Sequence, residues 1–124
     1  MPTPIDRIAE EHLRIWNSAP SAERTSAAAS LYTEDVLTAE PAASYTSPAG
    51  VEQAIDGLHA ALPDLQLRRT GAIQTAQNLS TYSWALGAPG GPAVVTGRDI
   101  LLIVDDRISS LYVLIDEPEE AAAD

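Results

Sequence analysis

The sequence contains no cysteine, so neither a disulfide bridge nor a thiolate metal site can form within the chain. Phenylalanine is also absent, methionine occurs once, and the only aromatic residues are two tryptophans and four tyrosines. A core with so few rings must be filled by alanine, leucine, isoleucine and valine, or it leaves a cavity. The composition therefore allows a hydrophobic pocket.

Positive charge is scarce as well. Seven arginines and no lysine oppose 18 acidic residues, which gives a net charge of −11 at pH 7. Nucleic acid and membrane surfaces are therefore not expected as partners, because anionic phosphates require basic patches. No run of 18 apolar residues occurs, and the N-terminal MPTPIDRIAEE lacks the pattern of a signal peptide. We expect a cytoplasmic protein, and abundant alanine with arginine in place of lysine is typical of GC-rich bacterial coding sequences.

Apolar residues at helical spacing predict three helices in the first half of the chain, over Pro4–Asn17, Ser21–Tyr32 and Gly50–Leu62. Between the second and third helices, a polar corner at residues 33–35 leads into a short strand, Val36–Glu40. Glu40 thus ends a strand and precedes a proline, which has no N–H.

The second half of the chain changes to strand patterns. Four long antiparallel strands are predicted, over Leu65–Thr75, Leu79–Leu86, Ala93–Val104 and Arg107–Ile115. Helices followed by strands indicate the α+β class. At 124 residues the chain suits one domain, which we expect to span residues 1–116. The acidic segment 117–124 is expected to be a disordered tail.

The last two predicted strands are apolar on both faces, as Ile100–Val104 and Leu111–Ile115 show. Three helices can cover only one face of a sheet, so the other face would be a large apolar patch in a monomer. We therefore predict a homodimer with sheet-to-sheet contact. The alternative is a sheet so strongly curved that it buries more of both faces.

Short motifs follow one another in a characteristic order between residues 5 and 116: Trp16-Asn17, Leu31-Tyr32-Thr33-Glu34-Asp35-Val36, Glu40-Pro41, Gly50-Val51-Glu52-Gln53-Ala54-Ile55, Leu62-Pro63-Asp64-Leu65, Gly97-Arg98-Asp99 and Asp105-Asp106-Arg107-Ile108. In this order and spacing the chain resembles the SnoaL-like branch of the nuclear transport factor 2-like (NTF2-like) superfamily, which includes ketosteroid isomerases and polyketide cyclases. The resemblance implies three N-terminal helices packed on a curved antiparallel sheet, forming a cone with an internal pocket, often dimeric. The family does not share one activity, so site residues need a separate argument.

Three titratable residues are the catalytic candidates. The resemblance places Glu40 where the isomerases carry an Asp-Pro general base, and Asp99 where they hold a protonated aspartic acid as an oxyanion donor. A carboxylate in an apolar cone has a raised pKa, which suits removal of a proton next to a carbonyl. His12 lies on the apolar face of the first helix, near the position of the isomerases' oxyanion tyrosine, and could donate a hydrogen bond or shuttle a proton.

Each of these residues also has a structural interpretation. Glu40 would then be a solvated acid at a strand end, Asp99 would pair with an arginine, and His12 would be a core residue with satisfied hydrogen bonds. Aromatic side chains are the candidate ligand-binding residues, although the same spacing suits the core: Trp16, Tyr82, Trp84 and Tyr112. Two histidines without a partner at metal spacing predict no metal site, and no motif indicates a cofactor.

These residues support three interpretations. The first is a protein with a pocket for a small apolar molecule that acts as an isomerase or cyclase, using a carboxylate to transfer a proton next to a carbonyl. The second is a non-catalytic ligand-binding or dimerisation module, and a third is an interaction scaffold whose pocket is filled. The resemblance also offers the opening of an epoxide, which in this superfamily uses an Asp-Arg-Asp arrangement. We disfavour this reaction because Arg98 and Asp99 are neighbours in one strand and point to opposite faces.

Overall fold

The computed structural model describes residues 4–116 of the chain, so the predicted tail at 117–124 lies outside the described part. Its helices and strands follow one another as α1 Pro4–Trp16, α2 Ala22–Leu31, β1 Tyr32–Ala39, β2 Ser44–Thr46, α3 Ser47–Ala61, β3 Gln66–Arg69, β4 Gln74–Ala76, β5 Leu79–Gly87, β6 Ala93–Val104 and β7 Arg107–Ile115. No helix within residues 4–116 has the length and apolar character needed to cross a membrane.

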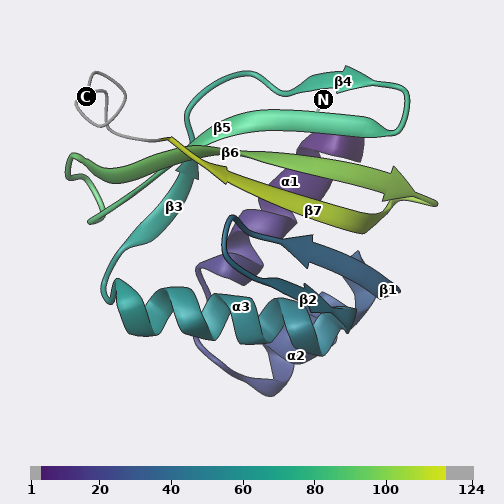
Figure 1. Cartoon of the computed structure of the whole chain (residues 1–124), viewed down its shortest axis with the longest axis horizontal. Helices are drawn as coiled ribbons and strands as arrows, with labels where there is room; N and C mark the ends of the chain where they lie inside the picture. Colours follow the sequence, from purple (N-terminus) through teal and green to yellow (C-terminus); the bar gives the residue numbers. More distant parts are fainter. Residues whose placement is uncertain (1–3, 117–124) are drawn as a thin grey trace.

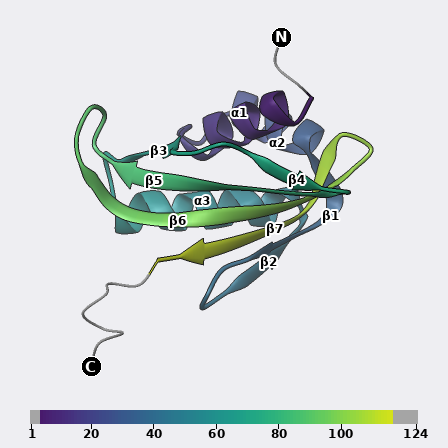
Figure 2. The ribbon, with the colours of Figure 1, turned by 90° about the horizontal axis from the view of Figure 1, so that it is seen from above.

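The strands form one curved sheet in the order β2-β1-β7-β6-β5-β3, and β4 pairs with β5 (Figures 1 and 2). This arrangement confirms the predicted α+β class. One detail differs, because β1 and β7 run parallel and the sheet is mixed. Antiparallel neighbours follow from short hairpin turns, whereas most of the chain lies between β1 and β7, so no turn dictates their relative direction.

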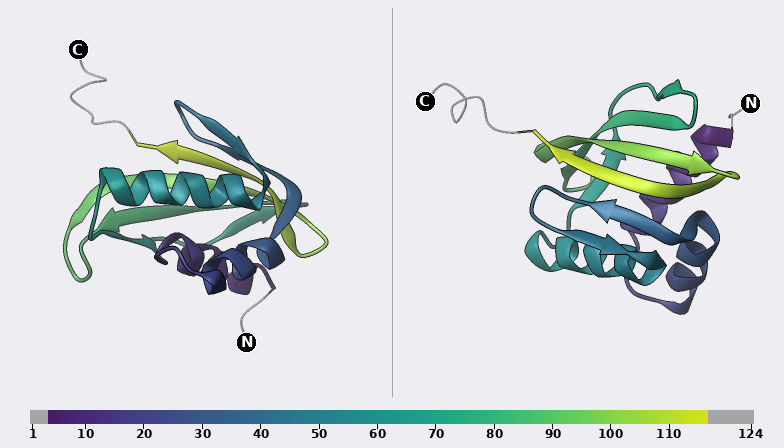
Figure 3. Two further views of the ribbon diagram at one scale, coloured as in Figure 1. Left: turned by 90° about the horizontal axis from the view of Figure 1, so that it is seen from below. Right: turned by 45° about the vertical axis from the view of Figure 1, so that its right-hand side comes forward.

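The helices cover one side of the sheet. In Figure 1, α1 lies behind β5, β6 and β7, and Figure 3 shows α3 alongside the β1–β2 hairpin. α2 contacts both α1 and α3 and joins the helices into one layer. The core between this layer and the sheet contains fully buried aliphatic side chains that include Ile15, Val36, Ile55, Leu101 and Leu111.

The predicted boundaries of α1 and α2 hold to within one residue. Ser21 caps α2, since its side chain accepts a hydrogen bond from the Arg24 N–H at 3.0 Å. The prediction for α3 was wrong at its N-terminus, because the helix begins at Ser47 and takes a proline into its first turn. Proline fits there because its fixed φ suits a helix and its missing N–H would be unpaired anyway.

Two strand predictions need correction. The segment predicted as one strand, Leu65–Thr75, forms two short strands, β3 and β4, which pair with successive halves of β5. The strand predicted from Val36 starts at Tyr32, and the polar corner appears as a register shift in the β1–β7 ladder between Tyr32 and Leu37. The ladder between β1 and β7 is therefore interrupted at the polar corner.

Candidate functional site

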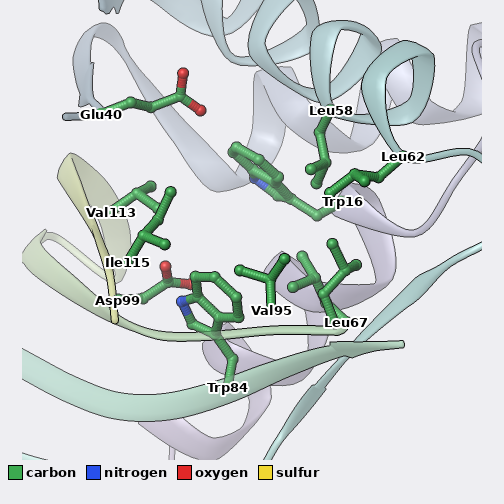
Figure 4. Close-up of a pocket in the computed structure, with 11 residues that line it drawn as sticks. Trp16, Glu40, Leu58, Leu62, Leu67, Trp84, Val95, Asp99, Val113 and Ile115 are labelled. Carbon is green, nitrogen blue, oxygen red and sulfur yellow. The ribbon is translucent and has the colours of Figure 1, made fainter. Parts of the chain in front are cut away.

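An apolar cavity of about 250 Å³ lies between α1, α3 and the inner face of the sheet (Figure 4). This volume is below the ~300–1,000 Å³ of pockets for drug-sized ligands, so the cavity suits a small molecule. Its lining comes from both helices and four strands: Trp16, Glu40, Leu58, Leu62, Leu67, Trp84, Leu86, Val95, Asp99, Val113 and Ile115. All of these side chains except the two acids are aliphatic or aromatic.

The two acids reach the cavity from different strands. Glu40 directly follows β1, and Asp99 lies in the middle of β6. Both carboxyl groups point to the same part of the cavity in Figure 4, with Val113 and Ile115 of β7 between them. This agrees with the sheet order, in which β7 separates β1 from β6. The leucines of α3 and β3 line the opposite part, so the cavity has an acidic end and an aliphatic end.

Asp99 is anchored by hydrogen bonds from behind the cavity. Its Oδ2 accepts one from the Tyr82 hydroxyl at 2.9 Å and lies 3.1 Å from His12 Nε2. His12 Nδ1 in turn lies 2.7 Å from the Tyr32 hydroxyl, which accepts a hydrogen bond from Trp16 Nε1 at 3.2 Å. In one consistent assignment, the Tyr32 hydroxyl donates to His12 Nδ1 and the His12 Nε2–H donates to Asp99 Oδ2. Asp99 Oδ1 has no hydrogen-bond partner within residues 4–116.

The two tyrosines of this chain of hydrogen bonds are completely buried. Burial raises the pKa of Tyr32 and of Tyr82, and the nearby Asp99 raises both further, since a phenolate beside a carboxylate is unfavourable. Both phenols therefore keep their protons at neutral pH and act as stable donors. They fix the positions of His12 and Asp99.

Glu40 has a different environment. Its backbone N–H donates to the Ala43 carbonyl at 2.8 Å in the β1–β2 turn. Its carboxyl group has no hydrogen-bond partner within the described chain, and burial raises its pKa. A second, more open hollow of about 390 Å³ shares Glu40, Leu58 and Ile115 with the cavity, so Glu40 lies where the two meet.

Trp84 forms a wall of the cavity because of a glycine on the neighbouring strand. It pairs with Gly97 across β5 and β6, and a Cβ at that position would collide with the indole ring and with the Leu114 carbonyl. Only glycine lets the ring lie this close to β6. Trp84 is 5% exposed, and its Nε1 has no hydrogen-bond partner in the described part of the chain.

The structure brings two of the three catalytic candidates into the cavity. Glu40 and Asp99 line it, whereas His12 does not, because it is buried behind Asp99 on α1. The expectation that all three would converge on the pocket therefore needs correction. Asp99 is paired with His12 and Tyr82 rather than with an arginine. Arg98 points to the other face, where it donates to the hydroxyl groups of two β5 residues, Thr81 and Ser83.

The aromatic candidates divide in the same way. Trp16 and Trp84 line the cavity, and Tyr82 lies behind Asp99. Tyr112 is 38% exposed on the outer face of the sheet, since it alternates with the inward-facing Val113 along β7. Sequence reasoning also missed the aliphatic lining and Tyr32. Val95 is the exception, because strand parity places it on the face of β6 that carries Asp99, and both line the cavity.

Comparison with known proteins shows what else has this architecture. No protein-family model matches the sequence, and no curated protein matches it significantly. A presumed isomerase of the SnoaL-like family from Agrobacterium tumefaciens is similar in structure, with a TM-score of 0.85 and 21% identity, covering 94% of this chain and 100% of that one. A presumed polyketide cyclase from Sinorhizobium meliloti has a TM-score of 0.69 and 14% identity, covering 90% and 99%.

A third solved structure contains a ligand. It is a protein with a ketosteroid isomerase-like fold from Catenulispora acidiphila in complex with trimethylamine, with a TM-score of 0.69 and 17% identity, covering 86% of this chain and 82% of that one. The chain therefore has the NTF2-like fold, which the SnoaL-like proteins and ketosteroid isomerases share. At these identities the likeness establishes the fold and no activity.

We expect Gly97→Ala to destabilise the protein by about 1–3 kcal/mol, because the added methyl group must displace the Trp84 indole or the β7 backbone. Urea unfolding followed by tryptophan fluorescence measures this change. Gly57→Ala is the matched control, since a Cβ there meets nothing within 4 Å, and it should stabilise α3 by about 0.4–1 kcal/mol. Equal effects of the two substitutions would contradict the role of Gly97.

The raised pKa of Glu40 makes the stability of the protein depend on pH. The folded state holds this proton more tightly than the unfolded state, so ionisation of Glu40 disfavours the fold as the pH rises through its folded pKa. Glu40→Gln should therefore stabilise the protein relative to wild type at pH 7, with the difference vanishing below about pH 4. Urea unfolding at both pH values tests this expectation. Glu34→Gln, at an exposed position of β1, controls for the loss of one negative charge. If the stability difference between Glu40→Gln and wild type were the same at both pH values, the expectation for Glu40 would be contradicted.

Proposed function

We propose that this chain binds a small apolar molecule with a carbonyl group and transfers a proton on the carbon next to that carbonyl. The observation that carries the proposal is the pair of carboxyl groups, Glu40 and Asp99, pointing into an otherwise apolar cavity. The presumed isomerase and cyclase among the structural neighbours support the same reaction class.

In this proposal the two acids have different roles. The two carboxyl groups differ in hydrogen bonding, since Asp99 Oδ2 accepts from Tyr82 and lies 3.1 Å from His12 Nε2, whereas the Glu40 carboxyl group has no partner within the described chain. Glu40 is the base, because a carboxylate with a raised pKa is a stronger proton acceptor at neutral pH. Asp99 contacts the ligand through Oδ1, because its Oδ2 is occupied by Tyr82 and His12. His12 positions Asp99 and does not touch the ligand.

Exchange of α-protons tests this reaction without knowledge of the natural substrate. 2-Tetralone is a small ketone with acidic protons next to its carbonyl, and in D₂O these protons exchange when a base removes them. We expect the protein to accelerate the exchange, as followed by proton NMR. Glu40→Gln should reduce the acceleration by about 10²–10⁴-fold, the usual contribution of a general base.

The exposed Glu34→Gln variant is the control and should exchange like wild type. If Glu40→Gln were as fast as wild type, Glu40 would not be the base. If wild type bound 2-tetralone without accelerating exchange, the protein would be a non-catalytic binding module for such molecules.

A second candidate function is the binding of a small organic ammonium ion. Two indole rings and two carboxyl groups in one cavity resemble the surroundings that proteins provide for such cations. The structural neighbour that binds trimethylamine supports this candidate. Calorimetric titration with trimethylammonium and with 2-tetralone distinguishes the two ligand classes.

We also propose a homodimer formed through the outer face of the sheet. No described helix covers this face of β5, β6 and β7 in Figure 1. It carries the exposed Tyr112 and Leu114 and, across the β6–β7 ladder, their partners Ile100 and Arg98. Exposed apolar side chains with an arginine among them are typical of an interface between subunits. The cytoplasmic location stays a prediction from the sequence.

Sedimentation velocity tests the dimer. Wild type should sediment as a dimer at micromolar concentration, and Leu114→Glu should sediment as a monomer because the interface would bury an unpaired carboxylate. Ala60→Glu, at an exposed position of α3, adds the same charge elsewhere and should stay dimeric. A monomeric wild type would overturn the proposal.

A further inference from the structure

The two tryptophans of the cavity wall differ in one respect. Trp16 Nε1 donates to the Tyr32 hydroxyl, so its hydrogen-bonding capacity is used inside the protein. Trp84 Nε1 is buried and has no partner within residues 4–116. Buried N–H groups are nearly always paired, because losing water without gaining another acceptor is unfavourable. An unpaired donor at the wall of a cavity points to a ligand that supplies the acceptor.

The surroundings of Trp84 also restrict where this donor points. The ring lies against Gly97, which leaves no room between the indole and β6. In Figure 4 its nitrogen lies on the edge that faces the Asp99 carboxyl group, at the acidic end of the cavity. Asp99 Oδ2 is occupied by Tyr82 and His12, which leaves Oδ1 for a ligand. Trp84 Nε1, Asp99 Oδ1 and the Glu40 carboxyl group are thus the polar groups at this end without a partner in the described chain, and of these Trp84 Nε1 is the nitrogen donor.

We infer that the Trp84 N–H donates a hydrogen bond to the carbonyl oxygen of the ligand, beside Asp99 Oδ1. This inference rests on the proposed function and adds the residue that selects the ligand class. An indole N–H can only donate, so it requires a ligand with an oxygen acceptor. A trimethylammonium ion has no acceptor and would leave the N–H unpaired. Trp84 therefore favours a ketone or an enol over an organic cation.

The same bond assists the proposed reaction. When Glu40 takes the proton from the α-carbon, the C–H electron pair forms the carbon–carbon double bond and the carbonyl π pair moves to oxygen. Negative charge then grows on the atom that Trp84 contacts, so the bond strengthens in the transition state. Glu40 returns the proton to a carbon, and no oxidant or further reactant is needed.

The indole N–H signals in a ¹H–¹⁵N NMR spectrum test the inference directly. The chain has two tryptophans, so two indole signals are expected, and Trp84→Phe identifies which is which. The probes are 2-tetralone and tetralin, the hydrocarbon of similar shape that lacks the oxygen. We expect 2-tetralone to move the Trp84 proton signal downfield, whereas tetralin leaves it in place. The Trp16 signal should respond alike to both probes.

The ratio of the affinities for 2-tetralone and tetralin supplies a second readout. It does not depend on ring packing, because packing affects both probes alike. Replacing Trp84 by Phe removes the N–H together with part of the ring, and the loss of ring contacts weakens both probes. The preference for 2-tetralone over tetralin should fall by about 2- to 13-fold, which corresponds to one hydrogen bond. The NMR titration itself uses wild-type protein, and Trp16→Phe assigns the two indole signals if Trp84→Phe does not fold.

The outcomes separate this inference from the function on which it rests. If 2-tetralone binds and exchanges its α-protons while the Trp84 signal stays in place, the donor assignment is wrong and the proposed function stands. An unchanged preference for the ketone in Trp84→Phe leads to the same conclusion. If neither probe binds, or only trimethylammonium does, both the proposed function and the inference are overturned.

Discussion

The hydrogen bonds that converge on Asp99 are the interaction on which the rest of the site depends. They run from Trp16 through Tyr32 and His12 to Asp99, and a further bond comes from Tyr82. Together they connect α1 to β1, β6 and β5 beneath the cavity. Each of these polar atoms would be costly to bury without a partner, so the hydrogen-bond network fixes the position of α1 relative to the sheet. It also holds one Asp99 oxygen in a fixed position at the cavity.

The cavity exists because the layers around this network are not filled. A chain without phenylalanine has few rings with which to close the space between α3 and the curved sheet, and aliphatic side chains line what remains. Glu40 and Asp99 are brought to one end of it by strands that are neighbours of β7, not of each other. The carboxyl groups are thereby restricted to one end of an apolar space, which is the setting that the proposed proton transfer requires.

Much of the fold could be predicted from local pattern. The helices over residues 4–16 and 22–31, the hairpin turns at 87–92 and 105–106, and the inward direction of His12 follow from spacing and turn residues. The direction of β1 against β7 could not be predicted, because strand parity does not encode which distant strand becomes a neighbour. The division of residues 65–75 into β3 and β4 depends on pairing with β5, which is a tertiary contact.

For the site, the sequence alone determined the identities of the two acids, the opposite directions of Arg98 and Asp99 and the shared face of Val95 and Asp99, since these depend on residue type and on alternation along one strand. Only the tertiary structure decided that His12 lies behind Asp99, that Tyr112 faces outward, and that one tryptophan N–H is used while the other is free. The physical reason is that hydrogen-bond partners in this site lie 16 to 87 residues apart. Their meeting depends on how helices and sheet pack, and no local pattern records that packing.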